Sequence, residues 1–298
     1  MFSDTHFHFG YLHEKFGAEE ASKILFNMAQ TDVFFGMDIG TRAEDLQNRA
    51  HALEESLSFI EDDAVRRKAE DFIFLSAGIW PDTDAILDRE NQMRILEKSI
   101  SDFKNSGCIF SKKLVAIGEG GLDHHWNPSG VDGRCESDFD EKVFEGEREL
   151  FLMELSLAKK MNLPFIVHSR DAWQETVEVL RESDSHNGII HCYSYGKEEL
   201  KPFLDMGWYI SLSGSVTYAK KSKLDAVNEM IRYIPEDRLL LETDSPYLAP
   251  VPERGNTNTP VFVRHTYEAV ARARNVPVED LCALVDENIQ RLFLKNIK

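Results

Sequence analysis

Residues 114–123, LVAIGEGGLD, decide the fold, because a short aliphatic run there leads into a carboxylate followed by two glycines. Such a run is typical of a buried β-strand. Seven more runs of this kind occur along the chain, each followed by a polar or glycine-bearing turn and a segment of helical periodicity. The eight expected strands are Phe2–His8, Val33–Gly40, Ile73–Trp80, Leu114–Asp123, Phe165–Arg170, Gly188–Ser194, Trp208–Gly214 and Leu239–Ser245.

Eight strands that alternate with helices predict a parallel (β/α)8 barrel, the TIM barrel of the α/β class. Parallel strands need helical crossovers and are covered on both faces. A chain of 298 residues is of the size that such barrels reach as one domain, so we expect residues 1–298 to form a single domain. The expected helices are Ala18–Gln30, Ala85–Asn105, Glu141–Met161, Ala172–Glu182, Leu224–Tyr233, Val261–Asn275 and, outside the barrel, Val278–Phe293.

Two connections are longer than the short turns of an ideal barrel. The crossover from Ala43 to Asp71 is polar and contains EDDAVRRKAED, which we interpret as a solvated helix face. The segment HHWNPSGVDGRCESDFD, residues 124–140, is rich in Gly, Asp and Ser and predicts a long loop. Long loops at the top of a barrel often shape the substrate site.

The composition bounds the function. An apolar fraction of 42% without any run near the ~20 apolar residues of a membrane span excludes a bilayer crossing. The start, MFSDTHFHFG, has neither a basic nor an apolar targeting region, so we expect a cytoplasmic location. The net charge of −18 argues against broad electrostatic binding to nucleic acid, although divalent metals can hold a phosphate locally.

The cysteines are scattered and form neither a CxxC nor a zinc-knuckle spacing; they are Cys108, Cys135, Cys192 and Cys282. We interpret all of them as reduced thiols. Cys192 lies beside a motif, IIHCYSY, and is expected to be a small strand residue rather than a nucleophile.

The strongest local motif is DTHFH, residues 4–8. Strand alternation places His6 and His8 on one face, where both imidazoles can reach the same metal ion. A structural pair of histidines is as compatible with this motif alone.

Polar residues of metal-ligand type recur near the ends of four other expected strands: Glu119, His168, His191 and Asp244. Active sites of barrel enzymes lie at the C-terminal ends of the strands. Any one of the four could be a buried residue satisfied by hydrogen bonds, but the set favours a site. With His6 and His8, four histidines and two carboxylates exceed the needs of one tetrahedral ion and suit two ions bridged by a carboxylate.

The ordered segments DTHFH, GEGGLD, LPFIVHSRDA, GIIHCYS, LLLETDSPYLAP and RGNTNTP span nearly the whole chain. In this order they resemble the TatD-type metal-dependent deoxyribonucleases, a family of amidohydrolase-like barrels. The resemblance implies that His6, His8 and Asp244 bind one metal ion. It implies further that Glu119 bridges to a second ion, which His168 and His191 complete.

The resemblance also implies a reaction. Family members act on DNA, often as exonucleases from the 3′ end, with magnesium or another divalent ion. We therefore expect two divalent ions per chain, Mg, Mn or Zn; histidine-rich ligation by itself favours zinc or manganese. The expected partner is DNA or another phosphodiester, bound weakly and through the metals, without an obligate protein partner.

Two positions depart from the family pattern. Phe9-Gly10 stands where the family commonly has a hydrophobic residue and an acidic one, which alters a contact outside the ligands. His124-His125 replaces the usual aromatic residue after GLD, and the following loop is longer. Both changes concern substrate preference more than metal binding.

The expected catalytic residues are Asp244 and Glu119, with Asp244 also able to accept the proton of an attacking water. Glu242, which would share a strand face with Asp244, is interpreted as an outer partner of the metal site or as part of a structural ion pair. Candidate substrate-binding residues are Arg170, Arg254 and His124, and Trp80 and Trp126 are candidates for stacking on a base.

Two other functions remain compatible with the sequence. The same residues would serve hydrolysis of an amide, ester or lactone, including an aminoacyl ester of tRNA, because activated water attacks carbonyl and phosphoryl centres alike. A non-catalytic metal-binding protein is the second alternative, and it would be favoured if ligands were missing. None of the six is missing.

Overall fold

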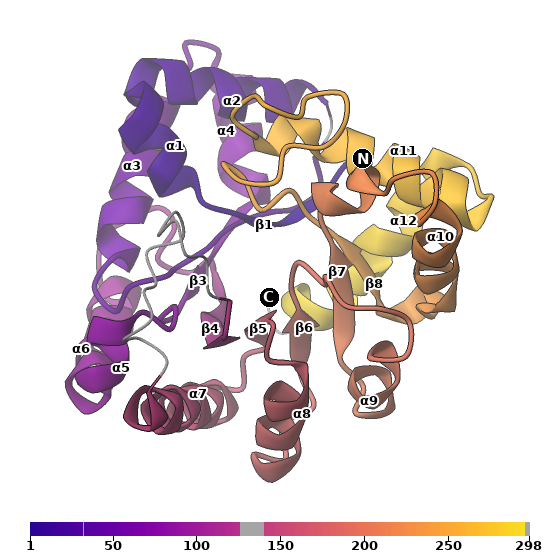
Figure 1. Cartoon of the computed structure of the whole chain (residues 1–298). Helices are drawn as coiled ribbons and strands as arrows, with labels where there is room; N and C mark the ends of the chain where they lie inside the picture. Colours follow the sequence, from indigo (N-terminus) through magenta and orange to yellow (C-terminus); the bar gives the residue numbers. More distant parts are fainter. Residues whose placement is uncertain (32, 126–139, 296–298) are drawn as a thin grey trace.

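The computed structural model of the chain describes residues 1–31, 33–125 and 140–295 (Figure 1). Its strands form one parallel sheet in sequence order, from β1 to β8. The strands are β1 (Asp4–Phe7), β2 (Gly36–Asp38), β3 (Ile73–Ala77), β4 (Leu114–Asp123), β5 (Phe165–Arg170), β6 (Gly188–Ile190), β7 (Tyr209–Leu212) and β8 (Leu239–Leu241).

The first and last strands close the sheet. The backbone N–H of Asp244 donates to the carbonyl of His6 at 2.8 Å, and the N–H of His8 donates to the carbonyl of Ser245 at 2.8 Å. Phe7 and Ser245 form a parallel bridge. Figure 1 shows the strands around a common centre with helices outside them, so the predicted (β/α)8 barrel is confirmed.

Several strands are shorter than predicted. β4 and β5 have the predicted bounds, but β6 ends at Ile190 and β8 at Leu241. Beyond these ends the backbone takes a left-handed conformation, with φ of 43° at Cys192 and 56° at Asp244. A strand cannot continue through such residues. His191 and Asp244 therefore lie in the segments that follow their strands.

Helices connect the strands and cover the barrel (Figure 1). They are α1 (Phe9–Phe16), α2 (Ala18–Gln30), α3 (Leu46–Ser58), α4 (Asp63–Phe72), α5 (Thr83–Leu87), α6 (Arg89–Lys104), α7 (Glu141–Met161), α8 (Trp173–Glu182), α9 (Leu200–Asp205), α10 (Leu224–Tyr233), α11 (Val263–Arg274) and α12 (Val278–Ile289). Within the described ranges, none of them is both long and apolar enough to cross a membrane.

The helices correct the sequence interpretation in one place. The single helix expected over Ala85–Asn105 is divided at Asp88, whose carboxylate accepts hydrogen bonds from the side chains of Asn91 and Gln92 at 2.9 and 3.1 Å. The polar crossover contains α3 and α4, and the charged side chains of α4 are exposed or half-buried, as expected. Asp62 caps α4 by accepting from the N–H of Ala64 at 2.8 Å.

The core of the barrel is filled by aliphatic and aromatic side chains. Phe35, Phe74 and Phe293 stack on one another, with ring centroids 4.8 and 5.4 Å apart along the stack. The long loop after β4 lies largely outside the described residues, and so do Trp126 and Cys135. The polar residues of the predicted site gather where the strands end.

Candidate metal centre

Two histidines and two carboxylates form a first group of ligand atoms, between β1, β4 and the segment after β8. His6 Nε2 and His8 Nε2 are 3.3 Å apart. Glu119 Oε2 lies 3.3 and 3.7 Å from these nitrogens, and Asp244 Oδ1 lies 3.6 and 3.4 Å from them. Four electron-rich atoms from three segments of the chain thus face one point.

A second group lies on the other side of Glu119, at the ends of β5 and β6. Glu119 Oε1 is 2.7 Å from His168 Nδ1 and 3.0 Å from His191 Nε2, and the two nitrogens are 3.2 Å apart. One oxygen of Glu119 therefore belongs to each group. The structure brings together all six residues that the sequence proposed as ligands.

The spacing of these atoms fits divalent ions. Nitrogen and oxygen ligands at about 2.1 Å from a tetrahedral ion lie roughly 3.4 Å from one another. The contacts within the first group, 3.3 to 3.7 Å, match this edge length. The second group is slightly tighter, and one of its contacts, His168 to Glu119, is a hydrogen bond of 2.7 Å. Both donor sets, imidazole nitrogen with carboxylate oxygen, suit zinc, manganese or a similar ion.

The glycines after Glu119 allow neighbouring segments to approach β4 closely. A Cβ at Gly120 would lie 2.1 Å from Glu154 Oε2, and a Cβ at Gly121, where φ is 144°, would lie 2.1 Å from the carbonyl oxygen of His168. No side chain fits at either position. Gly121 therefore allows the close approach of β5 that brings His168 to Glu119, and Gly120 allows that of Glu154, on α7.

Electrostatics keep the bridging carboxylate ionised. Glu119 is 4% exposed. Burial raises its pKa, but His191 and His168 outweigh burial and hold the pKa well below its usual range. Burial lowers the pKa of His168, and here Asp123 and Glu119 outweigh it and raise the pKa to about 9. Without a metal ion, the second group therefore pairs an anion with protonated imidazole.

Carboxylates behind the second group hold its histidine rings. Asp123 Oδ2 lies 3.0 Å from His168 Nε2. Glu242 Oε1 lies 3.3 Å from His191 Nδ1 and accepts the backbone N–H of Cys192 at 2.7 Å. Carboxylates in such positions fix the tautomer and orientation of a ligating histidine. The expectation that Glu242 shares a face with Asp244 is wrong, because β8 ends at Leu241 and the strand alternation stops there.

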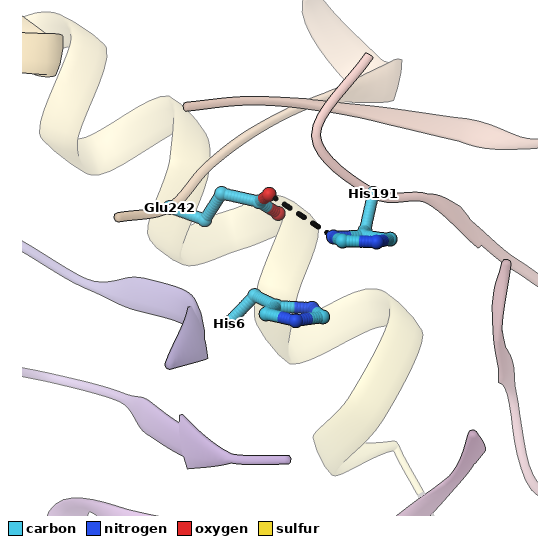
Figure 2. A group of neighbouring side chains, drawn as sticks. All are labelled: His6, His191 and Glu242. Atoms are coloured by element: carbon cyan, nitrogen blue, oxygen red, sulfur yellow. Dashed lines mark hydrogen bonds and ion pairs between the residues drawn. The ribbon is translucent and has the colours of Figure 1, made fainter. Parts of the chain in front are cut away.

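Figure 2 shows Glu242 directed at the His191 ring, with His6 beside it. The rings of His6 and His191 are stacked, with centroids 4.0 Å apart and planes 8° from parallel. These residues are also close enough to hold an ion of their own. Because Glu242 Oε1 already binds the N–H of Cys192, its contacts are those of a residue that orients His191.

The candidate substrate residues lie at the rim of the centre, and each has a partner. His124 Nε2 is 2.9 Å from Glu147 Oε2, on α7. The guanidinium of Arg254 lies over the ring of Tyr218 at 4.4 Å, which leaves its N–H groups at the solvent. Arg170 ends β5 and is half-buried near Asp123, where its charge contributes to the low pKa of that carboxyl.

Aromatic and sulfur groups beside the centre have modest roles. Trp80 lies edge-on to His168, with ring centroids 5.8 Å apart. Tyr247 is 54% exposed and lies 6.1 Å from the ring of His8. Burial raises the pKa of the Cys192 thiol well above its usual range, which agrees with its interpretation as an unreactive strand-end residue.

Asp4 and Asp123 are two site residues to which the sequence assigned no role. Asp4 is fully buried and accepts hydrogen bonds from the N–H and hydroxyl of Thr243 at 2.9 and 2.6 Å. Burial raises its pKa to about 8. In the sequence each is a carboxylate within an apolar strand or at its end, as Glu119 is. The same signal therefore marks Asp4 in DTHFH and Asp123 in GEGGLD.

An eight-stranded barrel with histidines and carboxylates converging at one mouth defines a metal-dependent hydrolase. Comparison with protein families matches residues 3–294 to the TatD related DNases. The chain belongs to this family, and the resemblance inferred from its motifs is confirmed.

Individual relatives support this assignment. The chain is 36% identical over 231 residues to YabD of Bacillus subtilis, an uncharacterised metal-dependent hydrolase, covering 76% of this chain and 79% of YabD. It is 30% identical over 229 residues to the 3′-5′ ssDNA/RNA exonuclease TatD of a Rahnella species, covering 75% and 78% of the two chains. The crystal structure of YjjV, a TatD homologue from Escherichia coli, has a TM-score of 0.75 at 24% identity and covers 98% of both chains.

Proposed function

We propose that this hydrolase is a nuclease that cleaves phosphodiester bonds of single-stranded nucleic acid and removes nucleotides from the 3′ end. The observation that carries the proposal is the position of Glu119, with one oxygen in each ligand group. A carboxylate shared in this way suits two ions a few Å apart, the arrangement that recurs in phosphodiester hydrolysis. The Rahnella relative, named as a 3′-5′ exonuclease, supports the direction.

In this proposal His6, His8 and Asp244 would hold one ion, His168 and His191 the other, and Glu119 both. Divalent ions held there would lower the pKa of a nearby water and offset negative charge on the phosphoryl oxygens. The protein's own contribution is orientation. Asp123 and Glu242 fix the rings of His168 and His191, and the close approach of β4 and β5 fixes Glu119.

Asp244 is the proposed proton acceptor. Its carboxylate belongs to the first group, and Oδ1 lies 3.4 Å from His8 Nε2. Burial raises the pKa of Asp244, but His8 and His6 outweigh it and lower the pKa, so the group is ionised at neutral pH. An ionised carboxylate beside the ligand atoms can accept the proton of the attacking water.

Arg170, Arg254 and His124 are proposed to contact the substrate's phosphates. Arginine binds phosphate in bidentate fashion, and the stacking of Arg254 on Tyr218 keeps its donor groups at the surface. The chain's charge of −18 opposes long-range attraction of a polyanion. Binding is therefore expected to be weak and to depend on the metals.

The proposal is tested with single-stranded DNA oligonucleotides labelled at either the 3′ or the 5′ end, in the presence of Mg²⁺, Mn²⁺ or Zn²⁺. The wild type should shorten the strand progressively from its 3′ end. Glu119→Gln should be inactive, and the surface variant Glu97→Gln, whose carboxylate pairs with Lys160 on the outside, should behave as the wild type.

Two results would contradict the proposal in different ways. Cleavage at internal positions would refute the exonuclease direction but keep the nuclease. No cleavage by a folded, metal-loaded protein that hydrolyses an amide, ester or lactone would show instead that the substrate is a carbonyl compound.

A further inference from the structure

A pocket of about 320 Å³ opens beside His8, between α1, the loop after β2, and α3. Helices α1 and α3 lie side by side (Figure 1). His8, a member of the first ligand group, is part of its wall, so the pocket lies directly beside that group. Its volume lies at the small end of the range for ligand pockets, roughly 300–1,000 Å³. It is of a size for one nucleotide rather than several.

The pocket has a fixed frame. Arg49 is buried and pairs with Asp38, and its Nε donates to Asp45 Oδ1 at 2.9 Å. The other oxygen of Asp45 accepts the backbone N–H groups of Thr41 and Arg42 at 2.9 and 3.1 Å. The loop that carries Arg42 is thus held in place without a ligand, and the charge of Arg49 is already compensated.

Four polar side chains of the wall are uncommitted. In the part of the chain that the structure describes, neither a hydrogen bond nor an ion pair is made by the side chains of Glu14, Arg42, Asn48 and His51. A site for a bare anion would be cationic throughout, but this wall offers a guanidinium, a carboxylate, an amide and an imidazole. A nucleotide matches that set, because its phosphate accepts from a guanidinium and its base presents both donors and acceptors.

Gly10 keeps the pocket open. A Cβ at this position would lie 3.3 Å from Arg49 Cγ, so a larger side chain would press on the frame and occupy the space beside His8. The sequence departs here from the acidic residue common in the TatD pattern. Tyr11, next to Gly10, also lines the pocket; its ring centroid lies 5.5 Å from that of His8, and its hydroxyl is held by Thr41 Oγ1 at 3.1 Å. An aromatic ring there can stack on a base.

We propose that this pocket binds the nucleotide next to the scissile bond, with Arg42 on its phosphate, Glu14 and Asn48 on the edge of its base, and Tyr11 against its face. The inference rests on the proposed function, since it places the end of a nucleic-acid strand beside the ligand groups. The inference adds a nucleotide subsite to the proposed nuclease. In this subsite Glu14 and Asn48 would determine which terminal base the protein prefers.

The first test measures the kinetics of cleavage. Arg42→Gln should raise KM for a single-stranded oligonucleotide about tenfold or more, the loss expected for a charge-assisted hydrogen bond. Arg94→Gln, which removes an exposed arginine of α6 outside the pocket, is the matched control. Equal KM values in the two variants would overturn the proposal.

A binding measurement separates this proposal from the nuclease itself. Deoxynucleoside monophosphates are titrated into the metal-loaded protein by calorimetry, which needs no turnover. Wild-type binding that weakens in Arg42→Gln and not in Arg94→Gln supports the subsite even if no nucleic acid is cleaved. Cleavage of DNA together with unchanged monophosphate binding in Arg42→Gln would refute the subsite and leave the nuclease standing.

Glu14→Gln provides a readout that a structural role would not change. A carboxylate accepts from the amino groups of bases, whereas an amide both donates and accepts, so the preference among terminal bases should shift about fivefold or more. Rates with four oligonucleotides that differ only in the last base measure it. An unchanged order of preference in Glu14→Gln would remove the base contact from the proposal.

Discussion

The two ligand groups on either side of Glu119 differ in what holds their histidines. In the second group a carboxylate lies behind each ring, Asp123 behind His168 and Glu242 behind His191. In the first group the Nδ1 atoms of His6 and His8 are buried without a hydrogen-bond partner in the described part of the chain. Side-chain carboxylates therefore orient the histidine rings of the second group, whereas the histidines of the first group are positioned by their backbone.

The backbone of the first group is held by the closure of the barrel. His6 and His8 exchange hydrogen bonds with the segment after β8, and Asp4 holds Thr243 in the same segment. The comparison shows that histidine ligands are positioned in two ways, by backbone hydrogen bonds in the first group and by carboxylate side chains in the second. It also predicts a chemical difference. In the first group burial lowers the pKa of His6 while that of His8 is raised, whereas in the second group the pKa values of both His168 and His191 are raised despite burial.

Substitution of Glu119, the residue that both groups share, should weaken both groups together. Glu119→Gln keeps the size of the side chain but leaves one carbonyl oxygen for two groups, so we expect kcat to fall about a thousandfold or more. Both ions should bind more weakly. Kinetics combined with metal analysis by mass spectrometry measure the two effects. A variant that retains two ions and near-normal kcat would show that Glu119 is no bridge.

Removal of one outer carboxylate should weaken one group alone. Asp123→Asn replaces the carboxylate behind His168 by a neutral amide, which is a weaker acceptor, and such changes typically cost about 10- to 100-fold in metal affinity. Affinity at the first group should stay the same. Metal titration by calorimetry resolves the two sites, and Asp171→Asn, an exposed carboxylate beside His125, is the control. Equal loss at both groups would mean that they are not independent.

The second group should also depend more steeply on pH. A protonated imidazole cannot bind a metal ion, and a pKa of about 9 keeps His168 protonated below that pH. Affinity at the second group should therefore rise by at least about tenfold per pH unit from pH 7 towards 9, since the pKa of His191 is raised as well. In the first group only the pKa of His8 is raised, and His6, whose pKa is lowered, contributes no such rise. Calorimetry in buffers of different ionisation enthalpy counts the released protons, and proton release that is the same in wild type and Asp123→Asn would contradict the assignment.

The smallest expected effect comes from the surroundings of β4, the strand that carries Glu119. Glu154 is buried behind β4, where it accepts the N–H of Ile79 at 2.8 Å. Burial raises its pKa well above the usual range. The native state therefore keeps a proton that the unfolded chain releases above pH ~4.5, so this group's contribution to stability falls as pH rises.

Glu154→Gln removes that titration and keeps an acceptor for Ile79. Its free energy of unfolding, relative to the wild type, should increase by about 1.4 kcal/mol per pH unit between pH 5 and 7. Urea denaturation at several pH values measures it, with the exposed Glu97→Gln as reference. Parallel pH profiles for Glu154→Gln and the wild type would show that Glu154 is ionised in the folded protein.

Much of the barrel could be predicted because its strands are continuous apolar runs. The bounds of β4 and β5 follow from the sequence. The predicted β6 and β8 are too long, because the sequence pattern does not indicate the left-handed backbone at Cys192 and Asp244. The division of the expected helix at Asp88 depends on local side-chain hydrogen bonds, which periodicity does not reveal.

Convergence of the six candidate ligands was predictable, because strand ends of a parallel barrel meet at one mouth. Their outer partners were not, because these depend on register. Asp123 reaches His168 because Gly121 pairs with His168 across β4 and β5, which no single motif encodes. The pocket beside Gly10 could not be predicted either. Its wall combines residues of α1 and α3, which are far apart in the sequence, around the buried Arg49.

The closure between β1 and β8 also sets an order of events during synthesis. Asp4 and Thr243, which bond to each other, are 239 residues apart, while Glu119, His168 and His191 lie within a shorter middle stretch. All ligands of the second group are present once β6 has left the ribosome, although Glu242, which orients His191, follows with β8. The first group must wait for the last strand, so nascent or truncated chains that end before Asp244 cannot carry the complete centre.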